Sequence, residues 1–419
     1  MTKAFTRTLL LAVLFCAISH VATAANDTIT TLNNVHQGNG NGLGTRTVYD
    51  TVVFPHDLSM YGQIKMHVKL SCPSGGCDAW DRFAQISLAH GGQWYEIGRY
   101  ITSYGKACGW EIDVTDYRYM LSDTVILMSF IDTWTNPGWL VKIDFEFMAG
   151  TPSSPAIQVE NLWQNYNLVY GDTTQPITLP ADTMLIRADA DSVKIKMVTT
   201  GHGQGNTNNA AEFSQMTHHV TLNDTALFSQ PLWRNNCNSN PCSPQNGSWT
   251  YNRAGWCPGA DVIPNVYDLS PHVTAGHSVR LGYNLQSYFN NCSPHNPACV
   301  QGSTCTDCNY NYNGHTEPHY KVSGQLITYY TPSHSGIAEA NEVTMGISPN
   351  PGTGQFRLYI GGANPNYQVL VTNHIGQAVW QGQVNSAITH INLEATPLGI
   401  YIVKVADGKS SRTFKIVKQ

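Results

Sequence analysis

Charge is scarce in this sequence of 419 residues. Acidic and basic residues together make up 12 %, against about 25 % in an average soluble protein. The 28 acidic residues outnumber the 23 Lys and Arg residues, which gives a formal net charge of −5. Because nucleic-acid binding needs clustered basic side chains, we expect no nucleic-acid partner. The chain also lacks long runs of helical period, which argues against a helical fold.

Long apolar runs are equally rare, and the one present lies near the N-terminus. Residues 9–18 are apolar, follow Lys3 and Arg7, and precede small residues at 22–24 (ATA). This order is typical of a secretory signal peptide, whereas a transmembrane anchor would need a longer run. We therefore predict a signal peptide over residues 1–24, no membrane span, and a secreted or cell-surface protein that passes through the periplasm.

Strand periodicity dominates the rest of the chain. Residues 63–70 (QIKMHVKL) and 140–147 (LVKIDFEF) alternate apolar and polar side chains, which is the pattern of a half-buried antiparallel strand. Turn residues recur about every eight to twelve positions, as in sandwiches and jelly rolls. The sequence therefore predicts an all-β fold.

Two stretches rich in proline, serine and threonine divide the chain, at 151–155 (TPSSP) and 331–335 (TPSHS). Segments of this composition are typical of connections between domains. We expect a β-domain over residues 25–150, a second over 151–331, a linker over 332–344 and a small β-module over 345–419.

Cysteine, in contrast, is plentiful. The chain has eleven, and ten remain once Cys16 leaves with the predicted signal peptide. An even number in an exported chain favours disulfides. Cys72 and Cys77 bracket a Pro-Ser-Gly-Gly turn and are candidates for a short-range pair, and Cys237 and Cys257 are further candidates. The spacing alone leaves the connectivity open.

Acidic and aromatic residues meet in several stretches outside the predicted strands. Tryptophan faces stack on sugar rings, while Asp, Glu and Arg hydrogen-bond to hydroxyl groups, so these stretches suggest carbohydrate chemistry. Structural loop residues and a weak surface Asp–Arg pair are the alternatives. The stretches contain Asp81 and Arg82 after Trp80, Asp132 and Trp134 after an apolar run, Glu212 after a Gly-rich segment, and Arg253 with Trp256.

The C-terminal module carries motifs in a fixed order. They are SPNP at 348–351, IGQ at 375–377, GIY at 399–401 and KIVK at 415–418. This set resembles the type IX secretion sorting domain. The resemblance implies a small β-sandwich that engages the type IX secretion machinery and has no chemistry of its own, and an accessory Ig-like domain is the alternative.

A longer resemblance spans roughly residues 51–330. The runs CDAWDR (77–82), WYEIGRYIT (94–102), EIDVTD (111–116), DTW (132–134) and RAGWCPG (253–259) occur in this order. They resemble the peptide-N-glycosidase F family. The resemblance implies two adjacent eight-stranded antiparallel jelly rolls with a site in the cleft between them.

The same resemblance implies a reaction. Members of the family hydrolyse the amide bond between an N-glycan and asparagine, which yields a glycosylamine and an aspartate, without metal or cofactor. We therefore expect N-linked glycoproteins and glycopeptides as substrates, and a monomeric enzyme.

The resemblance also assigns roles to individual residues. Asp81 takes the primary catalytic position, which activates water or relays a proton, with its backbone fixed by a Cys72–Cys77 turn. Glu212 takes the second acidic position, which binds the core sugars, and Asp132 takes a third. Matches near the cleft are Arg82, which would tune the local field, Arg253, which would polarise the carbonyl or steady negative charge, and Trp134 and Trp256, which would be pocket walls.

The sequence departs from the family at several of these places. Asp132 stands where the family archetype has a glutamate, and His202 stands where it has a tryptophan that contacts sugar. Ala210 and Ser214 occupy the positions of a disulfide beside the second acid. Because a misplacement of about 1 Å can cost about 10²-fold in rate, we expect these differences to alter substrate preference more than reaction class.

Three alternatives stay open. Cys305 and Cys308 with His315 and His319 have the spacing of a zinc site, although disulfides are commoner in exported chains. A copper-dependent monooxygenase of similar architecture would need ligands such as His202, His218, His219 and His319. A protein that binds N-glycans without catalysis would also fit the pattern.

Overall fold

The computed structural model describes residues 26–39, 45–154, 156–172, 174, 179–293, 295–296, 317–331, 345–348, 350, 352–360, 367–384, 388–407 and 411–418. The predicted signal peptide and the predicted linker over 332–344 lie outside these residues. Antiparallel strands build three two-sheet bodies, and the only helices described are the short 3-10 turns η1 to η4. The prediction of an all-β fold is confirmed.

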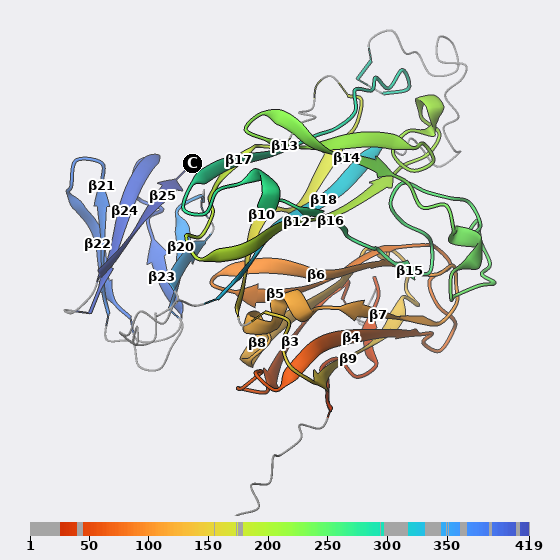
Figure 1. The fold of residues 1–419 in the computed structure, drawn as a ribbon, viewed down its shortest axis with the longest axis horizontal. Helices are drawn as coiled ribbons and strands as arrows, with labels where there is room; N and C mark the ends of the chain where they lie inside the picture. Colours follow the sequence, from red (N-terminus) through yellow and green to blue (C-terminus); the bar gives the residue numbers. More distant parts are fainter. Residues whose placement is uncertain are drawn as a thin grey trace, which may run out of the picture.

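The first body packs two sheets over an apolar core (orange to red in Figure 1). Alternate residues of β4 are buried at Ile64, Met66, Val68 and Leu70, as its period of two predicts. One sheet has the order β1 (Asp27–Thr30), β9 (Trp139–Ala149), β4 (Tyr61–Ser71) and β7 (Cys108–Asp113), with β2 (Val35–Gln37) also on β9. The other has the order β15 (Ala260–Asp261), β6 (Gln93–Ile101), β5 (Phe83–His90), β8 (Asp123–Ile131) and β3 (Thr47–Phe54).

The second body lies beside the first (yellow-green to cyan in Figure 1). Its core includes Trp163, Met197 and Tyr283. One sheet has the order β10 (Ala156–Val169), β18 (His319–Tyr330), β12 (Ala190–His202) and β16 (Asn265–Asp268). The other has the order β11 (Asp182–Leu185), β17 (Ser278–Asn284), β13 (Met216–Leu222) and β14 (Thr225–Leu232).

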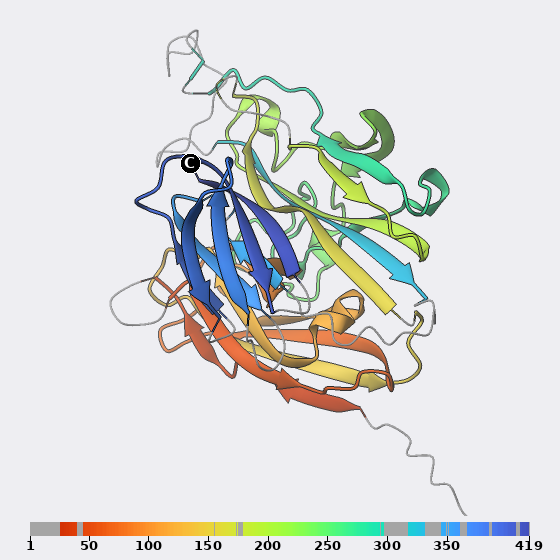
Figure 2. The same ribbon diagram turned by 90° about the vertical axis from the view of Figure 1, so that its left-hand side faces the viewer.

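The third body is a smaller sandwich at the C-terminus (blue in Figures 1 and 2). Its core includes Phe356, Val371 and Val403. Gly346 lies against the backbone of Gly91, so this body touches the turn between β5 and β6. Its sheets have the orders β19 (Met345–Ser348), β20 (Gln355–Ile360), β23 (Ile388–Asn392), and β22 (Ala378–Gln383), β21 (Gln368–Asn373), β24 (Gly399–Ala406), β25 (Ser411–Lys418).

The seam between the first two bodies is crossed by covalent and hydrogen bonds. A disulfide joins Cys108 on β7 to Cys242, and β15 pairs with β6 in the sheet of the first body. At the centre of the seam, the buried Arg99 guanidinium binds Glu96 and reaches the carbonyl of Lys321 on β18. These bonds hold the two bodies in one relative position, so a site built from both can be preorganised.

Two further disulfides join Cys72 to Cys77 and Cys237 to Cys257. The pairing of Cys108 with Cys242 was not anticipated, because residues 134 apart in sequence give no local signal. No helix in the described residues has the length and apolarity that crossing a membrane requires.

Candidate active site

Asp81 lies on the loop that leads from the Cys72–Cys77 turn into β5. The turn contains Gly75 and Gly76 with φ of 100° and 104°, a backbone region that favours glycine. Arg82 makes no ion pair with Asp81, although its charge acts to lower the pKa of that carboxyl. Its guanidinium instead donates to both oxygens of the buried Asp78, at 2.7 and 3.3 Å.

Asp78 therefore holds this loop in place through its hydrogen bonds. Besides Arg82, it accepts hydrogen bonds from the Thr133 hydroxyl at 2.6 Å and from the backbone N–H of Trp80 at 3.1 Å. A bidentate arginine–carboxylate pair fixes orientation as well as distance. Since the residues on either side of Asp81 are held in this way, its carboxylate is presented in one direction.

The Asp81 carboxylate meets two groups that the seam supplies. The Tyr104 hydroxyl donates to Oδ2 at 2.8 Å, and Nη2 of Arg253 lies 3.7 Å from the same oxygen. Burial raises the pKa of Asp81, although the Arg253 charge and the Tyr104 hydrogen bond act in the opposite direction. The Asp81 side chain keeps 14 % of its surface exposed, so solvent or substrate can reach it.

Arg253 joins Asp81 to the second predicted acid. Its side chain is fully buried, and its Nε donates to Oε1 of Glu212 at 3.2 Å. Nη1 donates to the carbonyl of Tyr251 at 2.7 Å, and Nη2 donates to the Tyr104 hydroxyl at 3.2 Å. Because every nitrogen of the guanidinium donates within the protein, its position is fixed relative to both carboxylates.

Glu212 is held by the Gly-rich segment that precedes it. A Cβ on Gly201 would lie 2.0 Å from the carbonyl oxygen of Ala211, so only glycine lets the two segments approach this closely. Ala211 itself has φ of 72°, and the backbone N–H of Gly203 donates to Oε2 of Glu212 at 3.0 Å. These contacts replace the disulfide that the resemblance implies at this loop.

The pKa of Glu212 is raised to about 7. Burial is the main cause, the charge of Asp81 adds to it, and Arg253 opposes it. Two carboxylates that share one guanidinium cannot both ionise freely, so their protons come off as a coupled pair. Near neutral pH the site therefore holds a basic carboxylate and a titrating one side by side, which suits acid–base chemistry.

Asp132 and Trp134 lie apart from this pair. Oδ1 of Asp132 accepts from Nη1 of Arg46 at 3.0 Å, and the Arg46 guanidinium stacks 3.9 Å above the Trp134 ring. Trp134 is 58 % exposed. In the described part of the chain, no hydrogen bond or ion pair joins Asp132 to Asp81 or Glu212. The arrangement presents an open aromatic face beside charged groups, as sugar binding requires.

His202 and Trp256 form a stack beside Glu212. The His202 ring lies 5.2 Å from Trp256 and 5.4 Å from His319, with nearly parallel planes. Burial, followed by the positive neighbours, lowers the pKa of His202 well below its usual value, so the ring is neutral. Trp256 is 3 % exposed and donates to the carbonyl of Gly201 at 2.6 Å. It therefore supports the site from within and is not an exposed pocket wall.

The four histidines considered as copper ligands do not converge. His218 is buried among tyrosine rings, with a pKa lowered to about 3 by burial, whereas His202 stacks on His319. Among the residues that the structure describes, no three of these histidines come within metal-binding distance of one another. Of the zinc-like set, Cys305, Cys308 and His315 lie outside the described residues.

Tyr104, Arg46 and Asp78 were not anticipated as parts of the site. Tyr104 is contributed from a position 23 residues beyond Asp81, and Arg46 from one 86 residues before Asp132. Tyr104 could have been noted because it lies two residues after the end of the WYEIGRYIT run. Burial and the charge of Asp81 raise the pKa of Tyr104, so its hydroxyl remains a hydrogen-bond donor.

A separate cavity of about 860 Å³ lies elsewhere along the seam, and none of the predicted site residues lines it. Two of its acids are held in ion pairs, Glu96 with Arg99 and Asp116 with Lys196. The coupled carboxylates at Asp81 and Glu212 are therefore the better candidate for chemistry.

Both resemblances are confirmed by similarity to known proteins. Residues 165–309 match the family described as "Peptide-N-glycosidase F, C terminal", and residues 346–419 match the "Secretion system C-terminal sorting domain". The chain is 31 % identical over 301 residues to peptide-N(4)-(N-acetyl-beta-D-glucosaminyl)asparagine amidase F of Elizabethkingia miricola. The matched region covers 66 % of this chain and 82 % of that protein.

Solved structures give the same result. PNGase F, a glycosylasparaginase from Flavobacterium meningosepticum, matches with a TM-score of 0.64 and 28 % identity, over 73 % of this chain and 96 % of that chain. PNGF-II matches with a TM-score of 0.57 over 74 % of this chain and 66 % of that chain. At 15 % identity, the second match shows a shared fold only.

Proposed function

The chain belongs to the peptide-N-glycosidase F family, and we propose that it is a secreted glycosylasparagine amidase. It hydrolyses the amide bond between an N-linked glycan and asparagine in glycoproteins and glycopeptides. The products are a glycosylamine and a peptide with aspartate in place of asparagine. The observation that carries this proposal is the pair of carboxylates, Asp81 and Glu212, fixed around the buried Arg253.

Amide hydrolysis needs a base for the attacking water, and Asp81 fits this role. Its carboxylate is partly exposed, and its raised pKa makes it a stronger base than an ordinary aspartate. The Tyr104 hydrogen bond fixes one oxygen, Oδ2, and leaves Oδ1 for the water. Asp81 thus takes a proton from the water as its oxygen attacks the side-chain carbonyl carbon. It returns this proton to the amide nitrogen as the C–N bond breaks, so the nitrogen leaves as the neutral glycosylamine and the carbonyl carbon becomes the aspartate carboxyl.

Glu212 binds and positions the sugar next to the scissile bond. With a pKa of about 7, it is partly protonated at neutral pH and can donate as well as accept hydrogen bonds. Sugar hydroxyls offer both kinds of partner. The N–H of Gly203 holds Oε2 and Arg253 holds Oε1, so the carboxyl is already oriented before substrate arrives.

The remaining residues divide between support and substrate contact. Arg253 acts as a fixed positive charge that limits repulsion between the two acids, since its nitrogens are already engaged. Arg82 acts through Asp78 on the loop that carries Asp81. Asp132 and Trp134, with Arg46, contact sugars at the open edge of the site.

The C-terminal body directs export. It matches a sorting domain over residues 346–419, which supports passage to the cell surface or the medium through the type IX secretion machinery. The catalytic groups all lie in the first two bodies. We therefore propose that activity does not depend on the C-terminal body.

The decisive experiment incubates the protein with a denatured N-glycoprotein and a defined glycopeptide, and follows the peptide by mass spectrometry. We expect loss of the whole glycan with conversion of asparagine to aspartate. A peptide that kept one GlcNAc would contradict amidase chemistry and indicate a glycosidase. If the protein bound glycopeptide without releasing sugar, and Asp81→Asn bound it equally well, a binding module would replace the proposed enzyme.

A further inference from the structure

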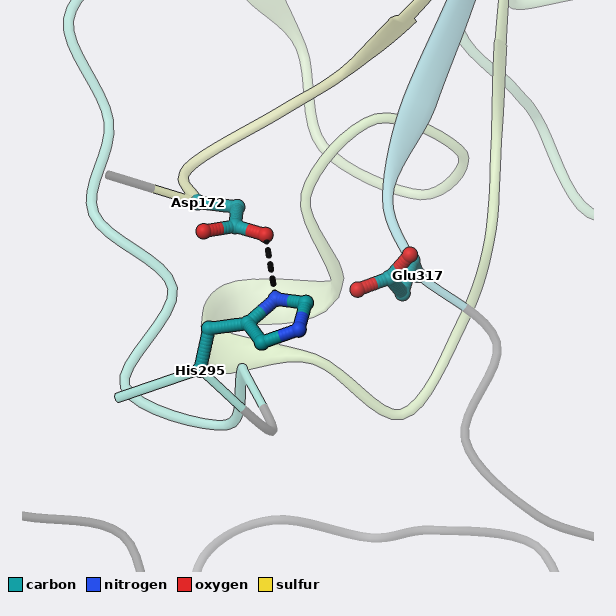
Figure 3. Close-up of side chains that lie close together, drawn as sticks. All are labelled: Asp172, His295 and Glu317. Carbon is teal, nitrogen blue, oxygen red and sulfur yellow. Dashed lines mark hydrogen bonds and ion pairs between the residues drawn. The ribbon is translucent and has the colours of Figure 1, made fainter. Parts of the chain in front are cut away.

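A second group of polar side chains lies at one end of the second body and takes no part in the proposed reaction. Asp172 follows β10, His295 lies in the segment after β17, and Glu317 precedes β18 (Figure 3). A potential donor atom from each of the three lies within 4.8 Å of those of the other two. Figure 3 shows the imidazole between the two carboxylates.

The state of each group suits a cation. Asp172 is 3 % exposed and accepts a hydrogen bond from Nδ1 of His295 at 2.7 Å. The backbone N–H and the hydroxyl of Thr174 also donate to Oδ1 of Asp172, at 2.9 and 2.8 Å, so the buried carboxylate is held in one orientation. Within the described residues, no hydrogen bond or ion pair reaches the carboxylate of Glu317. Two carboxylates thus face one imidazole, and no lysine or arginine of the described residues is bonded to either of them.

We propose that Asp172, His295 and Glu317 bind a divalent transition-metal cation, with Zn²⁺ as the first candidate. An imidazole with carboxylates is a donor set that zinc accepts, at bond lengths of about 2.0 to 2.2 Å. The hydrogen bond between His295 and Asp172 is replaced by a bond from each to the cation, and the ring then carries its proton on Nε2. The His295 side chain is 52 % exposed, so it is free to make this adjustment.

Binding has a structural consequence, because the cation links the three segments that carry its ligands. The backbone N–H of Tyr170 donates to the carbonyl of Pro318 at 2.7 Å, and that of Asn290 donates to the carbonyl of Gly171 at 3.0 Å. The cation adds a third link beside these two backbone hydrogen bonds. It therefore stabilises this end of the second body in the folded state.

This end of the body adjoins the loop that carries Glu212. A Cβ on Gly203 would lie 2.6 Å from the carbonyl oxygen of Glu317, so the two backbones touch. The N–H of the same Gly203 donates to Glu212. The metal site therefore supports the segment behind Glu212 without supplying a group to the reaction, which keeps it distinct from the proposed catalysis.

The test uses the full chain without its signal peptide, stripped with a chelator and then titrated with Zn²⁺. We expect saturable binding of about one ion per chain and a rise in Tm of about 5 °C at saturation. His295→Gln and Glu317→Gln should each weaken binding at least about tenfold, because a lost ligand is not replaced. Glu317→Gln is the safer variant, since its carboxylate has no hydrogen bond in the described residues to lose.

The matched control is His56→Gln. His56 also donates Nδ1 to an aspartate, Asp123, at 2.8 Å, but no third donor joins this pair among the described residues. His56→Gln should bind Zn²⁺ as the wild type does. Absence of saturable binding to the wild type would overturn the proposal. Binding unchanged in both His295→Gln and Glu317→Gln would overturn it too, because the ion would then sit elsewhere, for instance on cysteines.

Discussion

Two buried arginines cross the same seam, and they differ in how many acids they meet. Arg99 binds the single carboxylate of Glu96, and its remaining N–H groups donate to Thr200, Lys321 and Ser323. Arg253 instead lies between the carboxylates of Asp81 and Glu212.

The balance of charge explains what each cluster can do. One acid with one base leaves a closed ion pair that holds the two bodies together, with side chains 3 % and 0 % exposed. Two acids with one base leave a surplus carboxylate, and the pKa of Glu212 rises to about 7. Both acids there keep about one seventh of their surface exposed, at 14 % and 16 %. A buried arginine–carboxylate contact is thus structural or reactive according to its count of acids and its access to solvent.

The largest effect is expected when Asp81, the acid next to the proposed water, is neutralised. Asp81→Asn should lower kcat by about 10³-fold, because the amide cannot accept a proton. The Tyr104 hydroxyl can still donate to the amide oxygen, so the fold should persist. Glycopeptide turnover measured by mass spectrometry, with circular dichroism for folding, tests this. The exposed Asp123→Asn is the matched control and should retain full activity. A rate for Asp81→Asn near that of the control would show that Asp81 is not the base.

The cluster of Arg99 and Glu96, with one acid and one base, should give the opposite result: a loss of stability with little loss of activity. Arg99→Met leaves Glu96 buried without its partner, which should cost about 3 kcal/mol of unfolding free energy, toward the lower end for such a loss. The activity of the folded fraction should change by less than about twofold, since no proposed catalytic group contacts Arg99. Urea unfolding and initial rates at a temperature below the transition separate the two quantities. A large fall in kcat with unchanged stability would mean that the Arg99 cluster is not merely structural.

Glu212→Gln should lower the activity and should also change how stability depends on pH. Activity should fall by about 10²-fold, because the sugar next to the bond loses a fixed carboxyl. Stability should depend on pH: a folded pKa of about 7, above the usual value of 4.5, gives stability that is present at low pH and lost as pH rises through 7. Glutamine does not titrate, so Glu212→Gln does not lose stability in this way as pH rises. The Tm of the variant minus the Tm of the wild type should therefore be larger at pH 8 than at pH 5. Calorimetry at both pH values checks this, and an equal difference at the two pH values would contradict the raised pKa.

The difference between the two clusters could be predicted from the sequence only in part. The alternating pattern of residues 63–70 indicated β4 because burial on one face follows directly from a period of two. The family resemblance supplied Asp81, Glu212 and Arg253. It did not supply Tyr104 as a shared partner, because such contacts depend on how distant segments come together.

Neighbours in sequence gave only part of the contacts. Arg82 was expected to tune the local field, and its charge does act to lower the pKa of Asp81. Its hydrogen bonds, however, go to Asp78, which the sequence did not indicate. Trp256 was expected at the surface of the site, but its indole N–H bonds the carbonyl of Gly201 and the ring is buried. Composition gives residue types, and only the folded chain shows which of them remain exposed.

The smallest effect is expected at the edge of the site, where an acid has one base and is also exposed. Asp132 pairs with Arg46, with 35 % and 32 % of their side chains accessible. Solvent screens such a pair, so Asp132→Asn should change kcat by less than about tenfold and act mainly on KM. Steady-state kinetics on one glycopeptide give both constants, with Asp132→Glu as the conservative control. If Asp132→Asn lowered kcat as far as Glu212→Gln does, Asp132 would have to act on the reacting atoms, and exposure could not separate binding acids from catalytic ones.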